Sequence, residues 1–462
     1  MTQCTIWMNR TTSFNWKRPV VGIVRVELEI AAQLTKLYPD SQYKECIWNG
    51  DEFVELLADS VNQSTNTALL TPPVASVANN YLFTILPKKA ALFSLAQSFF
   101  SLMPQVFRPF TNKVMVAIKP KLTSIYRLYV KRCEAKKAVL PKGNSANSEP
   151  ENINAPLNTL FKRGDVLVSL GLDWDYDFVR QFFNLRMNEG IKIITCCYDL
   201  IPVLYPQYCA ANVANVFAAY FIELADASDH IVCISKQSQQ DLHYFLDNTG
   251  ACKVNTSVFE LGDNVPCSNS EMTAQISELL NEKYIIFVSS IERRKNHEVI
   301  YRAYHRLCRE GKKEELPLLV FVGMRGWGVD DLMKDIELDP LVDGLIVQMN
   351  HVTDSELLCL YENALFSVFP SLYEGWGLPV GEALSLGKPV ICSDQGSLPE
   401  VAGELAIYLD PWDVEAWARE IYSLVTHDEK RNELTQKIKE HYVKRTWDQS
   451  GLQFKQVIDA LV

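Results

Sequence analysis

The sequence lacks several features that would indicate other classes of protein. No apolar run approaches the roughly 20 residues that a membrane-spanning helix needs. No secretory signal occupies residues 1–16, which predicts a reducing, cytoplasmic location, and the twelve cysteines show no metal-ligand spacing. The formal net charge of −11 argues against general nucleic-acid binding. With 462 residues, the chain is long enough for two or more globular domains.

Residues 81–142 are the exception to this acidic balance. They hold twelve Lys and Arg residues against a single acid, Glu134, interleaved with Phe and Tyr side chains. Such a segment suits a membrane surface, where each basic residue can add about 1 kcal/mol of binding free energy. The alternative is a helical insertion packed on the N-terminal domain with a solvated basic face, and nucleic-acid binding comes third. Together with the polar stretch that follows, this composition predicts an insertion at about 81–156.

The chain is organised around residues 365–403. An apolar strand is followed by a turn with Gly375 and Gly377, a helix, a second apolar strand and another loop. This order is typical of doubly wound α/β folds, whose sites lie at the carboxyl ends of the strands. The glycines let a ligand approach the main chain closely, and Pro379 suits the start of a helix. The free N–H groups of that helix predict a phosphate-binding site.

Two carboxylates, Glu374 and Glu382, frame this turn. Taken singly, Glu374 would be a solvated loop acid and Glu382 a complement to the helix dipole. Together, with seven residues between them that include Gly-Trp-Gly-Leu-Pro, they closely resemble the signature of retaining glycosyltransferases of family 4. The resemblance implies the α/β GT-B fold, in which two Rossmann-like doubly wound domains face each other across a cleft. It also implies that Glu374 contacts the donor sugar and Glu382 the ribose, while the backbone around Gly377, Leu378 and Pro379 holds the diphosphate.

Apolar strands alternate with helices along most of the remaining chain. We predict an N-terminal Rossmann-like acceptor domain at 1–265, whose sheet closes with a strand at 258–261. We expect residues 262–281 to serve as a linker. A Rossmann-like donor domain follows at 266–445, and by resemblance a terminal helix at 446–462 returns to the first domain.

Arg294 and Lys295 follow another predicted strand. Long cationic side chains at a strand end can reach a diphosphate leaving group and stabilise it as negative charge builds. The two residues match the Arg-Lys pair of the family, and a solvated basic turn is the alternative. Asp199 lies in a Tyr-Asp-Leu-Ile-Pro turn that is similar to the family's turn at the interdomain cleft. Asp199 either contacts acceptor or sugar, or it only caps its turn.

Three further positions resemble sites of the family. Gly22, with Arg25, begins the helix that faces the donor phosphates in the family. Gly323 lies in a turn that resembles one facing the cleft, and Val352 ends the segment where members hold the nucleobase through backbone groups. Separately, Ser235 is placed to cap the helix that follows it.

The resemblance implies a retaining, membrane-associated or cytoplasmic hexosyltransferase of bacterial surface polysaccharide (lipopolysaccharide) synthesis. Residues 291–296 resemble the turn of bacterial polysaccharide mannosyltransferases, which favours mannose from GDP-mannose. The partners would be a nucleoside diphosphate sugar and a glycan or lipid-linked glycan, with no nucleic acid. No cofactor or metal is expected, because no Asp-x-Asp motif occupies an obvious strand end. The alternatives are a GT-B sugar-nucleotide epimerase or hydrolase, and a non-catalytic scaffold recruited through the basic insertion.

Overall fold

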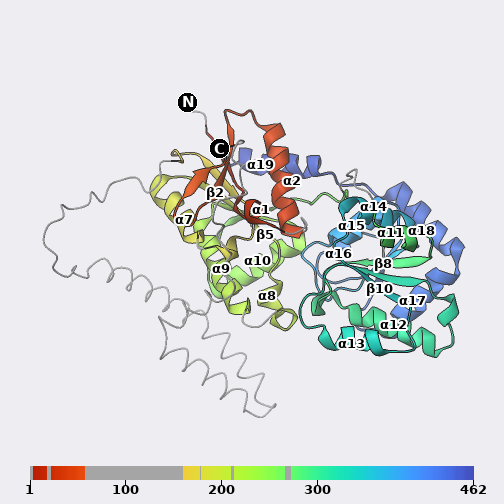
Figure 1. The fold of residues 1–462 in the computed structure, drawn as a ribbon. Coiled ribbons are helices and arrows are strands. Elements are labelled where there is room, and N and C mark those ends of the chain that lie inside the picture. The colour runs from red at the N-terminus through yellow and green to blue at the C-terminus, as the bar shows by residue number, and fades with distance from the viewer. Residues whose placement is uncertain (1–3, 18–21, 58–159, 177, 210–212, 266–271) are drawn as a thin grey trace, which may run out of the picture.

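The chain folds into two α/β domains, each built on a largely parallel sheet (Figure 1). The computed structural model describes residues 4–17, 22–57, 160–176, 178–209, 213–265 and 272–462. The insertion predicted at about 81–156 therefore lies outside the described residues. The predicted class, two doubly wound α/β units, is confirmed.

The N-terminal sheet has the strand order β3-β2-β1-β4-β5-β6-β7, and its pairs are parallel except for β2 with β3. Side chains alternate between its two faces, so that Ile6 and Met8 join one core and Trp7 the other. The strands are β1 (Ile6–Asn9), β2 (Tyr43–Trp48), β3 (Phe53–Glu55), β4 (Val166–Ser169), β5 (Lys192–Cys197), β6 (His230–Cys233) and β7 (Asn255–Val258).

Helices cover both faces of this sheet, as a parallel sheet requires. One core includes α2 residues and the other includes residues of α7, α9 and α10. The predicted cap of α10 is confirmed, because the Ser238 N–H donates to the Ser235 hydroxyl at 2.9 Å. The helices are α1 (Thr11–Asn15), α2 (Gly22–Leu37), α7 (Val179–Asn184), α8 (Ile201–Leu204), α9 (Val213–Ala227) and α10 (Lys236–Thr249).

The C-terminal sheet has the order β10-β9-β8-β11-β12-β13, and every pair in it is parallel. Its strands are β8 (Tyr284–Val288), β9 (Leu318–Val322), β10 (Ile346–Met349), β11 (Ser367–Phe369), β12 (Val390–Ser393) and β13 (Ile407–Leu409). The helices of this half are α11 (Ala274–Leu279), α12 (His297–Arg309), α13 (Asp330–Leu338), α14 (Asp354–Asn363), α15 (Leu378–Ser385), α16 (Leu398–Ala402), α17 (Val414–Thr426) and α18 (Asp428–His441).

The last helix, α19 (Trp447–Asp459), lies beside α2 of the N-terminal domain (Figure 1). The Phe454 ring packs edge-on against Phe259, with 5.4 Å between the ring centroids. The Tyr38 hydroxyl donates to the Asp459 carboxylate at 2.7 Å. The chain therefore passes from the first domain to the second and back again.

Two predicted boundaries are wrong. The last strand of the first sheet is Asn255–Val258 rather than 258–261, and the residue after it, Phe259, packs its ring against Phe454 of α19. Residues 262–281 are more than a linker, since α11 lies among them and buries Ile276 and Leu279. Three strands, β2, β3 and β13, were not predicted from the sequence. Within the described part of the chain, no helix is long and apolar enough to cross a membrane.

Candidate active site

The candidate active site lies where the C-terminal sheet reverses its strand order. β8 and β11 are neighbours, although β9 and β10 lie between them in the sequence. Open α/β sheets place their ligands at such a point, outside the carboxyl ends of the strands. Arg294 and Lys295 follow β8, and Glu374 follows β11. The fold thus brings together three of the predicted site residues from two distant segments.

Glu374 forms ion pairs with both cations. Its Oε1 accepts a hydrogen bond from Lys295 Nζ at 2.6 Å, and its Oε2 lies 2.9 Å from Arg294 Nη1. Burial raises the pKa of Glu374, but the charges of Arg294 and Lys295 outweigh burial and lower the pKa to about 2. Glu374 is therefore a carboxylate at any ordinary pH.

Arg294 is held by two further groups. Its Nη2 donates to Glu292 Oε1 at 3.0 Å and its Nη1 donates to the Tyr373 carbonyl oxygen at 2.9 Å. Burial lowers the pKa of Arg294, but Glu374 and Glu292 raise it above its usual value. Burial and the charge of Arg294 both lower the pKa of Lys295. Arg294 therefore stays protonated, and its two carboxylate partners, Glu292 and Glu374, fix the orientation of its guanidinium group.

Glu382 lies in α15 and is almost fully buried. Its Oε2 accepts from the Tyr361 hydroxyl at 3.0 Å, and its Oε1 accepts from Arg25 Nη1 at 3.4 Å. Arg25 also donates to Asp354 at 2.6 Å. Because Arg25 belongs to α2, which begins at Gly22, these contacts join the two domains. The roles of Gly22 and Arg25 beside donor phosphates remain predictions, and here Arg25 pairs with carboxylates instead.

The turn between Glu374 and Glu382 leads directly into α15. Gly377 is the residue before the helix, Leu378 begins it, and Pro379 occupies the first turn, as the sequence indicates. Ser397 from the next loop fixes the turn, since its hydroxyl donates to the Glu374 carbonyl oxygen at 3.1 Å. A helix N-terminus is thus held next to the cation pair, and it is a favourable environment for a phosphate.

Asp199 approaches this turn from the N-terminal domain. The Ile201 N–H donates to Asp199 Oδ1 at 3.0 Å, so Asp199 does cap its own turn. It also lies against Gly375, where an added Cβ would stand 2.5 Å from the Tyr198 carbonyl oxygen and 2.9 Å from Asp199 Cβ. Burial raises the pKa of Asp199, while Arg294 opposes that rise. Asp199 therefore caps its own turn and also lies beside the candidate site.

The N-terminus of α10 makes the neighbouring contact between the domains. The N–H groups of Lys236 and Gln237 donate to the Glu400 carboxylate at 2.8 and 2.7 Å. The Ser238 hydroxyl lies 3.3 Å from the Gly375 carbonyl oxygen, which it can reach as a donor. Figure 1 shows α10 on the side of its domain nearest α16, which carries Glu400. The two domains are in direct contact beside the ion cluster.

Gly323 and Val352 lie farther along the C-terminal sheet. Gly323 follows β9, and its N–H donates to the Met349 carbonyl oxygen at 2.9 Å. Val352 lies between β10 and α14 and is partly buried. Both belong to the carboxyl edge of the sheet, but neither forms a hydrogen bond with Glu374, Arg294 or Lys295. The place of Gly323 in a turn that faces the cleft and the place of Val352 in the nucleobase segment remain predictions.

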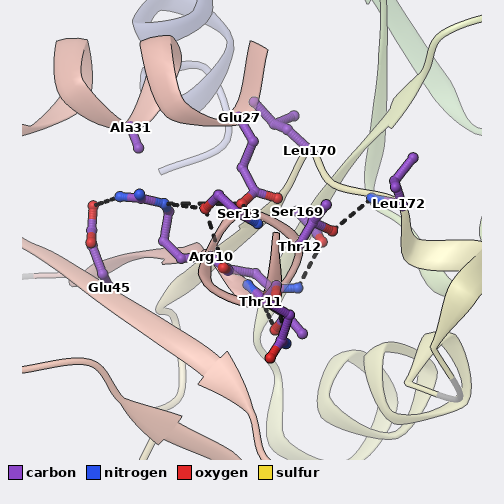
Figure 2. Close-up of polar contacts among 12 residues, drawn as sticks. Arg10, Thr11, Thr12, Ser13, Glu27, Ala31, Glu45, Ser169, Leu170 and Leu172 are labelled. Carbon is purple, nitrogen blue, oxygen red and sulfur yellow. Dashed lines mark hydrogen bonds and ion pairs between the residues drawn. The ribbon is translucent and has the colours of Figure 1, made fainter. Parts of the chain in front are cut away.

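A second polar cluster lies at the carboxyl ends of β1 and β4, where the N-terminal sheet reverses its order (Figure 2). Glu27 reaches from α2 toward the loop after β1, and its Oε1 accepts from the Ser13 N–H at 2.8 Å. Its Oε2 is buried without a hydrogen-bond partner among the described residues. Burial raises the pKa of Glu27 to about 7 and that of neighbouring Asp173 to about 8. Burial therefore favours the neutral form of both carboxyl groups at pH values below about 7.

We expect Glu27→Gln to stabilise the protein in a pH-dependent way. An acid whose pKa is raised by folding stays protonated while the unfolded chain ionises. The free energy of unfolding of the wild type therefore falls as pH rises from about 4 toward 7. Gln resembles the neutral acid and does not ionise, so the variant does not show this fall. The gain at pH 8 should exceed the gain at pH 5 by roughly 2 kcal/mol in urea unfolding.

The matched control is Glu52→Gln, which changes an exposed glutamate of the same domain. It should leave the pH profile of stability as in the wild type. A Glu27→Gln variant with the same gain at both pH values would show that Glu27 is already ionised in the folded protein.

The prediction that no Asp-x-Asp motif occupies an obvious strand end is wrong, because Asp173 and Asp175 follow β4 after a short turn. The Asp173 Oδ1 accepts from the Ser169 hydroxyl at 2.7 Å, and the side chain is buried in the second cluster. Across the described ranges, no three His, Cys, Asp or Glu side chains are grouped to hold a metal ion. Metal independence is a prediction that needs its own test.

Two doubly wound domains in contact, with a cation pair and a helix N-terminus beside that contact, define a GT-B type of glycosyltransferase architecture. A family model described as "Glycosyl transferases group 1" matches residues 269–441. "O-antigen chain mannosyltransferase B" of Escherichia coli is 30% identical over 261 residues, which are 56% of this chain and 68% of that protein. The chain belongs to the group 1 glycosyltransferase family.

Other similar proteins extend this picture. "Serotype-specific mannosyltransferase WbdA" of Escherichia coli is 28% identical over 303 residues, 61% of this chain but 37% of that protein. The chain therefore spans little more than a third of the WbdA length. Sucrose-phosphate synthase from Thermosynechococcus elongatus has a TM-score of 0.54 at 15% identity, with 99% of each chain covered. Anabaena HepE in complex with UDP and glucose has a TM-score of 0.50 at 13% identity, covering 64% of this chain and 77% of that one. These two structures support the fold alone.

The residues that hold the predicted site residues in place were missed. Glu292 fixes Arg294, Tyr361 and Asp354 surround the Glu382–Arg25 pair, and Glu400 bridges the domains. Glu292 could have been noticed as an acid two positions from a predicted catalytic Arg. The other three carry no signal in the sequence, because their partners are distant along the chain.

Proposed function

We propose that the chain is a retaining hexosyltransferase that moves mannose from GDP-mannose to a glycan or lipid-linked glycan in bacterial surface polysaccharide synthesis. The observation that carries this proposal is the Glu374–Arg294–Lys295 cluster at the start of α15 and at the contact between the domains. The relatives named as mannosyltransferases support the choice of sugar. We further propose a cytoplasmic enzyme with peripheral membrane contact through residues 81–142, which lie outside the described part.

Arg294, Lys295 and the α15 N-terminus would hold the donor diphosphate. Both cations pair with Glu374 in the structure, so a diphosphate would take over their charge and free Glu374 for the hydroxyl groups of the donor sugar. Glu382 would hold the ribose, in exchange for its contact with Arg25. As the sugar–phosphate bond breaks, charge builds on the diphosphate, and fixed cations stabilise that state more than the ground state.

Retention of configuration would follow from attack on the same face as the departing diphosphate. Asp199 would contact acceptor or sugar, and one of its oxygens already caps a turn. The leaving group would be neutralised by Arg294, Lys295 and backbone N–H groups, without a metal ion. The acceptor hydroxyl would then pass its proton to the leaving phosphate as the new glycosidic bond forms.

A thermal-shift screen with GDP, UDP and ADP tests the donor site. We expect GDP to stabilise the protein by about 2.7 kcal/mol at a hundredfold excess over its Kd, and UDP and ADP to do so less. Glu382→Gln should abolish the shift. Glu362→Gln, on the exposed side of α14, is the control and should keep it. No shift with any nucleotide would contradict the proposal. A shift with UDP alone would show that the donor is a UDP-sugar rather than GDP-mannose.

The same samples test metal independence. The GDP shift, and the transfer of mannose from GDP-mannose to a mannose-terminated acceptor, should be unchanged by excess EDTA. Loss of either on chelation, with recovery on adding Mg²⁺ or Mn²⁺, would show that a metal ion takes part. Release of free mannose without any acceptor-dependent product would indicate a hydrolase.

A further inference from the structure

Three tyrosine rings lie side by side next to the candidate active site. The ring of Tyr373, the residue before Glu374, lies 4.6 Å from the ring of Tyr205, measured between centroids. Tyr205 in turn stacks on Tyr208, with centroids 5.6 Å apart and planes 19° apart. Tyr373 comes from the donor domain, whereas Tyr205 and Tyr208 lie between α8 and Cys209 of the other domain. The stack therefore runs from one domain to the other.

The inner end of the stack is fixed to the ion cluster. The Tyr373 carbonyl oxygen accepts from Arg294 Nη1 at 2.9 Å, and the Tyr373 hydroxyl donates to Asp241 at 2.7 Å. Tyr373 is only 7% exposed. Its ring is thus fixed through its hydroxyl by Asp241, while its backbone is held by the same arginine that pairs with Glu374.

The outer two rings differ from the inner one in being partly exposed. Neither the Tyr205 nor the Tyr208 hydroxyl makes a hydrogen bond to any residue in the described ranges. The segment also lies near the candidate site, since the Tyr205 ring contacts the ring of Tyr373, the residue before Glu374. Two partly exposed phenol groups, whose hydroxyls have no hydrogen-bond partner among the described residues, therefore border the candidate site on the N-terminal side.

We infer that Tyr205 and Tyr208 form a subsite for the sugar chain of the acceptor. The C–H faces of a pyranose ring pack against aromatic rings, while phenol hydroxyls bond its hydroxyl groups, so one tyrosine offers both kinds of contact. An acceptor glycan must place one hydroxyl group near Glu374. If the rest of the glycan lies along the N-terminal domain, it contacts Tyr205 and Tyr208. The inference rests on the proposed function for its ligand class, a mannose-terminated saccharide, because it assumes that transfer occurs at Glu374.

The inference is tested without any donor by measuring the binding of α-linked mannobiose with saturation-transfer NMR. We expect Tyr208→Ala and Tyr205→Ala each to raise the Kd about tenfold, the size expected for a lost aromatic contact. Tyr208→Phe keeps the ring and should bind within about threefold of the wild type. Tyr244→Ala, at a highly exposed tyrosine of α10, is the control and should bind as the wild type does.

Each variant is also tested for its GDP thermal shift, which reports an intact donor domain. A Tyr208→Ala variant that keeps both the GDP shift and wild-type mannobiose affinity would overturn the inference. The inference would also be overturned if the wild type bound GDP but no mannobiose at millimolar concentration. The proposed donor site would then remain supported, but the tyrosine subsite would not. Tyrosine-dependent mannobiose binding in a protein that binds no nucleotide would support the subsite and contradict the proposed transfer reaction.

Discussion

Glu374→Gln should reduce the rate of mannosyl transfer by about three orders of magnitude, equivalent to about 4 kcal/mol of activation free energy. The substitution keeps the shape of the side chain but removes the carboxylate that pairs with Lys295 at 2.6 Å and Arg294 at 2.9 Å. In the proposed complex it also removes the charged contact to the donor sugar. The measurement is kcat and KM for the donor, with transfer followed by chromatography of the extended acceptor.

The same variant should lose stability, because two largely buried cations then face a neutral amide. Breaking a buried ion pair costs about 3 to 5 kcal/mol, although bound diphosphate should restore part of it by taking the place of the carboxylate. We therefore expect GDP to stabilise Glu374→Gln at least as much as it stabilises the wild type. Glu362→Gln is again the control. A Glu374→Gln enzyme with wild-type kcat would remove Glu374 from the mechanism, whatever its stability.

The sequence was sufficient for the parts of the site that lie within one strand–turn–helix segment. Glu374, Gly377, Pro379 and Glu382 occupy neighbouring positions in the chain, so local rules on turns and helix starts describe most of their setting. The resemblance to a family placed Arg294 near them. The structure adds the physical reason, which is that β8 and β11 are adjacent at the point where the sheet reverses its strand order.

Contacts between the domains could not be predicted in the same way. Arg25 was expected near phosphates, yet it pairs with Asp354 and Glu382, which lie more than 300 residues farther along the chain. The Glu27 cluster shows the same limit. Nothing in the pattern of α2 distinguishes Glu27 from an exposed helix glutamate until the loops after β1 and β4 close over it. Long-range pairings of this kind depend on how sheets and helices pack, which local periodicity does not encode.

Gly375→Ala should reduce mannosyl transfer about a hundredfold while leaving nucleotide binding in place. The new Cβ would stand 2.5 Å from the Tyr198 carbonyl oxygen, a backbone atom of the opposite domain that cannot move away by itself. The clash would hold the domains apart and separate Asp199 and the tyrosine subsite from the Glu374 turn. The measurements are kcat/KM for the acceptor, the GDP thermal shift, and the radius of gyration from small-angle X-ray scattering with GDP bound.

Gly311→Ala provides the contrasting control in the same domain. An added Cβ at Gly311 meets nothing within 4 Å, but the backbone there has φ +80°, which costs an alanine about 1 kcal/mol. Gly311→Ala should therefore lose stability and keep its activity, whereas Gly375→Ala should keep most of its stability and lose activity. If Gly375→Ala instead transfers mannose at the wild-type rate, the close contact between Gly375 and the Tyr198–Asp199 turn is not part of the reacting state. The acceptor would then have to be positioned by the donor domain alone.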